Sequence, residues 1–150
     1  ARDDLMQELH DQVKSSVDKG AKVVLGGEPV EGKGCFYPPT ILTDVTPDVP
    51  AYYEELFGPV ATVIRVKDEK EAIEVANATE FGLGGAVWTQ DSERGENVAA
   101  QIVAGAVFVN GLVKSDPRLP FGGVKISGFG RELSHYGIKE FVNIQTVWIK

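Results

Sequence analysis

The strongest constraint on the fold is the order of elements that the sequence predicts between residues 60 and 109. Three stretches rich in β-branched or small apolar residues, 60–66, 84–89 and 106–109, alternate with two stretches of helical periodicity. A strand–helix–strand succession favours right-handed crossovers between parallel strands. The three stretches are therefore expected to be neighbouring strands of a parallel sheet in an α/β fold.

The segments on either side extend this prediction. Leucine and valine recur every four residues from Leu5 to Val17 and predict a helix that Gly20 ends. Residues 22–25 are expected to form a short buried strand, and residues 41–42 another.

The chain from residue 110 onward departs from this regular pattern. Residues 110–134 are rich in Gly, Pro and charge and predict a long loop, of the kind that is usually functional or mobile. Residues 141–150 alternate enough to predict a terminal strand, whose edge is free to pair with a neighbouring sheet.

Composition argues against several classes of function. The 15 Lys and Arg against 22 Asp and Glu leave a net charge of −7, which argues against a nucleic-acid surface. Apolar stretches fall far short of the roughly 20 residues that cross a bilayer, so no membrane partner is expected. No export signal is visible, and we expect a soluble, cytoplasmic protein. One cysteine and two histidines cannot build a Cys/His zinc site, and no metal is predicted.

The single cysteine, Cys35, could act as a nucleophile with Lys33 nearby to lower its pKa. It lies in a Gly/Pro-rich loop, however, whereas an activated thiolate needs a partner base or a helix N-terminus. A structural role is favoured, and an independent thiol enzyme is the weakest hypothesis. His10 and His135 are expected in surface or capping roles.

Two segments carry more information. Residues 54–60 (EELFGPV) place two carboxylates directly before a predicted strand, although a solvated charge pair is the favoured interpretation of those residues alone. Residues 120–132 (PFGGVKISGFGRE) concentrate glycines and aromatics in one loop. Either the loop backbone approaches a ligand closely, or the loop folds on itself. Neither glycine pattern matches a nucleotide-binding fingerprint.

Four motifs taken in order resemble the C-terminal part of the NAD(P)-dependent aldehyde dehydrogenase superfamily: EELFGPV, ANATEFGLGGAVWTQD, GAVFVN and PFGGVKISGFGREL. The likeness covers essentially all 150 residues. SDPRLPFGG, RELSHYGIKEF and NIQTVWI are similar to bacterial succinate-semialdehyde dehydrogenases. The resemblance implies that residues 1–140 are the C-terminal part of a catalytic domain with a parallel sheet and a long glycine-rich loop. Residues 141–150 would then be an oligomerisation strand of a homodimer or homotetramer.

The resemblance also implies roles for four residues. Glu55 matches the carboxylate that accepts hydrogen bonds from the hydroxyls of the nicotinamide ribose, and Phe57 matches the aromatic that packs against the same end of NAD or NADP. Phe121 matches an aromatic that walls the aldehyde tunnel. Ser115 matches the serine that contacts the distal carboxylate of succinate semialdehyde.

Two cations flank Ser115. Lys114 and Arg118 could add positive charge for an acidic substrate, although exposed loop cations are the favoured interpretation.

No catalytic residue is expected within the chain. In the family, the nucleophilic cysteine of a Gly-Gln-x-Cys-type segment, the general-base glutamate and the oxyanion asparagine lie upstream of the matched part, and Cys35 does not match that nucleophile. For the intact enzyme the resemblance implies thiolate attack on the aldehyde, hydride transfer to NAD(P) and hydrolysis of the thioester. The 150-residue chain alone is expected to be inactive. The alternative is a truncated, non-catalytic interaction module that pairs through its terminal strand.

Overall fold

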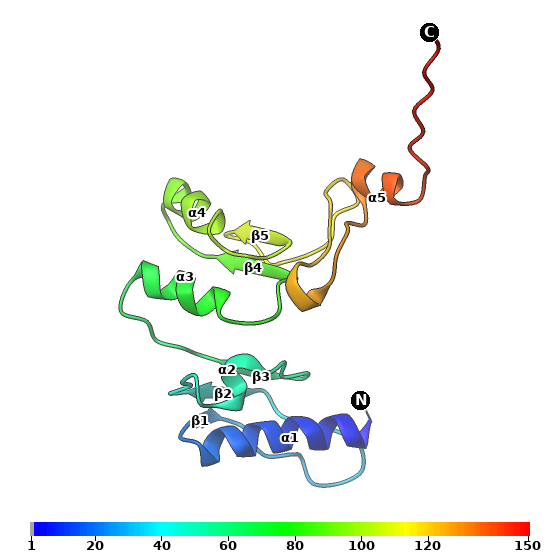
Figure 1. The fold of residues 1–150 in the computed structure, drawn as a ribbon. Helices are drawn as coiled ribbons and strands as arrows, with labels where there is room; N and C mark the ends of the chain where they lie inside the picture. The colour runs from blue at the N-terminus through cyan, green and yellow to red at the C-terminus, as the bar shows by residue number, and fades with distance from the viewer. Residues whose placement is uncertain (1) are drawn as a thin grey trace. The chain divides into compact units, whose positions relative to one another are not determined.

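The computed structural model describes residues 2–150. The chain forms two compact units, Ala1–Asp68 and Glu69–Lys150, and each is described by itself (Figure 1). Within the described range, no helix is long and apolar enough to span a bilayer.

The first unit combines a long helix with a three-stranded sheet. In chain order it contains α1 (Asp3–Asp18), β1 (Lys22–Leu25), β2 (Thr40–Thr43), α2 (Pro50–Tyr53) and β3 (Val60–Thr62). The strand order is β1-β2-β3, with β1 antiparallel and β3 parallel to β2. The strands predicted at residues 22–25 and 41–42 are therefore confirmed.

The apolar repeat of α1 builds the core of this unit. Leu9 and Val13 are buried, and Gly20, with a φ of 110°, follows the end of the helix as predicted. Glycine is favoured there because a side chain would strain that backbone conformation. The buried core cluster consists of Val13, Ala21, Leu42, Val45, Val49 and Ala51.

The prediction that residues 22–25 form a buried strand is wrong in one respect. All four residues of β1 are exposed, with Val24 64% and Leu25 53% accessible. The reason is position, because β1 lies at the edge of its sheet and pairs with β2 alone. An apolar run therefore did not indicate burial here.

The second unit contains the strand–helix–strand succession. α3 (Glu69–Asn77) precedes β4 (Gly84–Val87), and α4 (Ser92–Ala99) connects β4 to β5 (Ala106–Val109). β4 and β5 are parallel, with Gly84 opposite Ala106, which confirms the crossover.

One predicted pairing is wrong. β3 was expected beside β4, but it pairs with β2 in the sheet of the first unit, and β4 and β5 form a two-stranded sheet. The backbone bonds of β2 specify this choice, because the N–H of Thr40 donates to the carbonyl of Pro59 at 2.8 Å and Val63 donates to Leu42 at 2.8 Å. β3 also ends at Thr62, earlier than the predicted residue 66.

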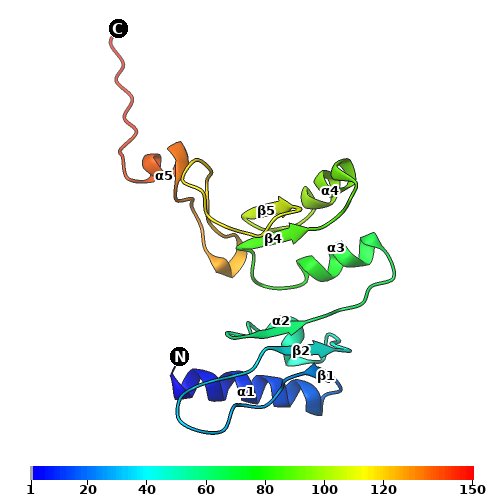
Figure 2. The same cartoon turned by 180° about the vertical axis from the view of Figure 1, so that it is seen from behind.

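The end of the chain differs from the predicted loop and strand. The long loop after β5 contains a short 3-10 turn, η1 (Lys125–Ser127), and is followed by α5 (Ser134–Glu140), which was not predicted. In both views the chain leaves α5 as an extended tail (Figures 1 and 2). Residues 141–150 are all exposed, and the strand predicted for them is not formed. A strand needs a partner for its backbone hydrogen bonds, and none of the strands in the described range pairs with this segment. The division at residue 140 and the oligomer contact stay predictions.

Candidate functional site

The segment between α2 and β3 presents two of the candidate side chains together. The chain leaves α2 with the N–H of Glu54 bonded to the carbonyl of Pro50 at 2.9 Å. Leu56 then packs against the core cluster, whereas Glu55 and Phe57 on either side of it are exposed. A half-buried leucine thus anchors the segment and leaves its two neighbours exposed.

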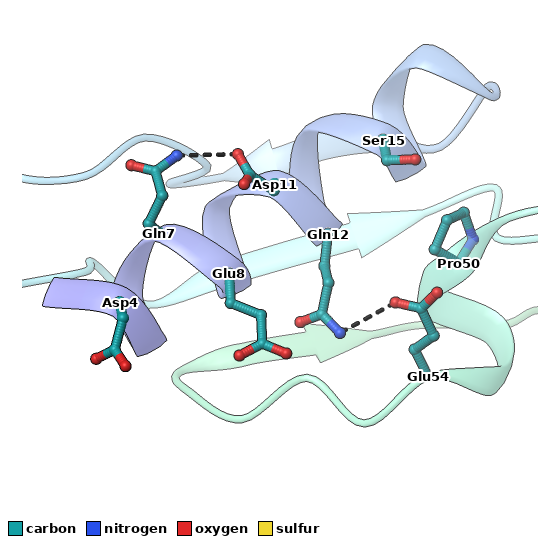
Figure 3. A pocket seen from close by; sticks show the side chains of 8 residues that line it. All are labelled: Asp4, Gln7, Glu8, Asp11, Gln12, Ser15, Pro50 and Glu54. Atoms are coloured by element: carbon teal, nitrogen blue, oxygen red, sulfur yellow. Dashed lines mark hydrogen bonds between the residues drawn. The ribbon is translucent and has the colours of Figure 1, made fainter. Parts of the chain in front are cut away.

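The Glu55 carboxylate is available to a ligand. It is exposed, and no donor within residues 2–150 is hydrogen-bonded to it. An ionised carboxylate is an acceptor with several lone pairs, and two hydroxyls of a diol can share it. The adjacent Glu54 differs, because its Oε2 accepts from Nε2 of Gln12 at 3.0 Å (Figure 3).

Phe57 lies at an apolar hollow of about 310 Å³. The residue is 72% exposed, so a flat ligand group could cover its ring. The other lining residues come from α1, from residues 35–37 and from the turn before β3: Leu5, Met6, Leu9, Cys35, Phe36, Tyr37, Gly58 and Pro59. Large exposed aromatic area is costly in water and is characteristic of binding surfaces.

The other two candidate residues lie in the second unit. Ser115 is exposed in the loop after β5. Phe121 is half-buried, and its backbone pairs with Glu132, donating at 2.9 Å and accepting at 2.8 Å. The structure therefore brings Glu55 and Phe57 together in one unit, and places Ser115 and Phe121 on one loop of the other.

The glycine-rich loop folds largely on itself. A Cβ on Gly105 would lie 1.6 Å from the carbonyl oxygen of Gly122, and one on Gly123 would lie 2.6 Å from the Cβ of Ser127. Nη1 of Arg131 also donates to the carbonyl of Gly123 at 3.0 Å. These glycines are required by the packing of the loop, which favours the second of the two interpretations given above.

Of the two cations that flank Ser115, Arg118 is paired with a carboxylate. Arg118 donates from Nε and Nη2 to the two carboxylate oxygens of Asp116, at 2.9 and 2.6 Å. This pairing holds the pKa of Asp116 well below its usual range and raises that of Arg118. Arg118 is therefore an exposed cation, as the favoured interpretation predicted. Its pairing could have been predicted from the sequence, because Asp116 lies only two residues before it.

Cys35 lacks the environment of a nucleophile. Its thiol donates to Oδ1 of Asp3 at 2.8 Å, and this bond to a carboxylate raises the pKa of Cys35. A raised pKa reduces the thiolate fraction on which reactivity depends. Nδ1 of His10 lies 3.3 Å from the hydroxyl of Tyr37, a structural contact.

A second hollow, of about 560 Å³, lies beside α1 and is strongly acidic. Its carboxylates are Asp4, Glu8, Asp11 and Glu54 (Figure 3). This charge disfavours anionic ligands. Across the described residues, no group of three or more His, Cys, Asp or Glu side chains could hold a metal ion.

Gln12 is the residue that sequence reasoning missed. It lies on α1 and donates from Nε2 both to the Glu54 carboxylate and, at 3.2 Å, to the backbone carbonyl of Glu55. Its partners are more than 40 residues away in the sequence, so no local pattern could have indicated the contact.

Comparison with known proteins gives one consistent family. A model described as the aldehyde dehydrogenase family matches residues 2–147. The NAD(P)+ succinate semialdehyde dehydrogenase Sad of Escherichia coli (strain K12) is 53% identical over 148 residues, which are 99% of this chain and 32% of that protein. The NADP(+) succinate-semialdehyde dehydrogenase 1 of Mycobacterium ulcerans (strain Agy99) is 53% identical over 142 residues, 95% of this chain and 31% of that protein.

A solved structure agrees with these relatives. The succinic semialdehyde dehydrogenase from Streptococcus pyogenes, in complex with NADP+, superposes with a TM-score of 0.95 at 44% identity and covers 99% of this chain and 32% of that one. The chain thus spans about a third of the length of the curated relatives that it matches.

Proposed function

Because this chain belongs to the aldehyde dehydrogenase family, we propose that it is the C-terminal catalytic-domain segment of a cytoplasmic enzyme that oxidises succinate semialdehyde to the carboxylic acid with NAD(P)+. The observation that carries the proposal is the paired exposure of Glu55 and Phe57 on a segment anchored by Leu56. The 53% identity with two succinate-semialdehyde dehydrogenases supports the choice of substrate.

Glu55 and Phe57 fit one end of the cofactor. Glu55 would accept hydrogen bonds from the ribose hydroxyls next to the nicotinamide, at about 1.5–3 kcal/mol for each bond to a charged group. Phe57 would pack against the same end through its exposed ring. Bound NAD(P)+ would supply the hydride acceptor, and the contribution of these two residues would be positioning.

Ser115 and Phe121 are proposed to act on the substrate. The Ser115 hydroxyl would bond to the distal carboxylate of succinate semialdehyde, and Phe121 would form a wall of the aldehyde tunnel. Because Arg118 is already paired with Asp116, the hydroxyl rather than the guanidinium is the better partner for that carboxylate.

The nucleophilic cysteine is proposed to lie in a preceding part of the protein, where the family carries it. Its thiolate would attack the aldehyde to form a thiohemiacetal, loss of hydride to NAD(P)+ would convert this into a thioester, and hydrolysis of the thioester would release the acid and the thiol. The exposed tail after α5 would pair with a sheet of another subunit and so form a homodimer or homotetramer.

The test begins with the coding sequence upstream of Ala1. An in-frame Gly-Gln-x-Cys segment is expected, and the full-length product should reduce NAD(P)+ in the presence of succinate semialdehyde. Substitution of Glu55 by Ala should raise the KM for NAD(P)+ by about tenfold or more. The isolated 150-residue chain should show no activity.

A start codon directly before Ala1 would contradict the proposal and favour a non-catalytic module. The exposed apolar tail, with Trp148 84% and Ile149 88% accessible, is the observation that favours that second candidate. Such a module would bind a full-length partner through its tail.

A further inference from the structure

We propose that Gln12 is a positioning residue for the cofactor, because it fixes the direction in which the Glu55 carboxylate leaves the chain. The inference rests on the proposed function, in which Glu55 accepts hydrogen bonds from the ribose. It extends that function to α1, where neither the resemblance nor the comparisons assign a residue.

The argument starts from the two bonds of one amide group. Nε2 of Gln12 donates to Oε2 of Glu54 at 3.0 Å and to the carbonyl oxygen of Glu55 at 3.2 Å. An amide nitrogen carries two N–H donors, so both are used. One bond holds the side chain of Glu54, and the other holds the backbone carbonyl of Glu55. Neither uses the Glu55 carboxylate, which stays free for a ligand.

The face of α1 that carries Gln12 also contacts the chain before and after Glu55. Three residues before Gln12, the buried Leu9 packs so closely on Gly58 that a Cβ there would lie 2.4 Å from Cδ2 of the leucine. Four residues after Gln12, the buried hydroxyl of Ser16 accepts the N–H of Ala51 at 3.1 Å. Residues three and four apart share a helix face. α1 therefore contacts α2, the segment with Glu55 and the turn before β3.

A glutamine suits this position better than a charged residue. A glutamate would repel Glu54 at hydrogen-bond distance, and a lysine could pair with a carboxylate of the acidic hollow instead. Gln12 donates without adding charge, and a hydrogen bond to a charged acceptor is stronger than a neutral one.

Gln7 offers a matched control on the same helix. Its Nε2 donates to Oδ1 of Asp11 at 2.9 Å, so it makes the same kind of bond within α1 and does not contact the segment with Glu55 (Figure 3). Gln7→Leu should therefore remove an equivalent bond without affecting the cofactor.

The experiment measures the KM for NAD(P)+ and for succinate semialdehyde in the full-length enzyme. Gln12→Leu should raise the KM for NAD(P)+ by about three- to tenfold and leave the KM for the aldehyde unchanged. Gln12→Glu, which keeps the length of the side chain but replaces the donor by a carboxylate that repels Glu54, should raise the KM for NAD(P)+ at least as much. Gln7→Leu should change neither constant.

A double-mutant cycle separates positioning from a general loss of stability. If Gln12 acts through Glu55, Gln12→Leu should have no further effect on the KM for NAD(P)+ in an enzyme that already carries Glu55→Ala. If Gln12→Leu changes the KM equally with and without Glu55→Ala, or has no effect in the parent enzyme, the inference about Gln12 is overturned and the proposed role of Glu55 stands. No effect of Glu55→Ala would overturn the proposed cofactor role of Glu55 and the inference with it.

Discussion

The buried hydroxyl of Ser16 links two helices of the first unit. It donates to the carbonyl of Gln12 at 2.7 Å and accepts from the N–H of Ala51 near the start of α2, where no capping side chain is present. Ser16→Ala should lower the free energy of unfolding by about 1–3 kcal/mol, because a buried N–H loses its acceptor. Urea denaturation would measure this loss. Ser15→Ala, one position away and half-buried, is the control and should have little effect.

The thiol of Cys35 gives a prediction that depends on pH. Its pKa is raised, chiefly by the hydrogen bond to Asp3, so the thiolate should form at a higher pH than the usual value of about 8.5. The rate of alkylation by iodoacetamide should therefore rise at a higher pH than it does for a free cysteine. Asp3→Asn should shift this profile to lower pH, whereas Asp18→Asn at the other end of α1 should not. An unchanged profile in Asp3→Asn would contradict the assignment of the cause.

Only short-range contacts of single residues could be predicted from the sequence. Asp91 is an example, because it caps the start of α4 by accepting from the N–H of Arg94, three residues later, at 3.0 Å, as aspartate commonly does at this position. The contact of Ser16 with Ala51 spans 35 residues, and it depends on how α1 packs in the folded unit. The proposed role of Glu55 came from a family resemblance, whereas the contacts of Gln12 with Glu54 and Glu55 were seen only in the structure.

At the scale of elements, Gly105 fixes how the glycine-rich loop meets β5. The carbonyl of Gly122 occupies the place where a side chain on Gly105 would lie, and the N–H of Gly105 donates to Gly82 at 2.9 Å. Gly105→Ala should cost at least about 3 kcal/mol, because a backbone group must move. A Cβ on Gly111 would lie 3.8 Å from its nearest neighbour, the Cβ of Phe108. Gly111→Ala should therefore change stability by less than about 1 kcal/mol. Thermal unfolding of the two variants would compare them directly.

The helices and strands with clear periodicity were predictable, and their pairing was not. α1, α4, β4 and β5 follow from apolar spacing and capping residues within each segment. The partner of β3 depended on β2, a strand of four residues with a weak signal of its own. The short helices α2 and α5 were missed because one follows prolines and the other follows a glycine-rich loop.

At the scale of the whole molecule, the tail determines assembly in the proposed function. Removal of residues 141–150 from the full-length enzyme should reduce its oligomeric state, because none of these residues pairs with a strand in the part of the chain that the structure describes. Size-exclusion chromatography with light scattering would measure the mass. An unchanged mass after truncation would contradict the assignment of the tail as the subunit contact.

The exposed edge of β1 has a consequence for this chain when it is produced alone. Val23, Val24 and Leu25 offer an apolar strand edge, and the tail, whose alternating sequence predicts a strand, offers a second exposed apolar segment. Two different adhesive surfaces on one polypeptide join copies head to tail, and such contacts extend into fibres unless the rotation between copies closes a ring. The isolated polypeptide is therefore expected to polymerise as its concentration rises.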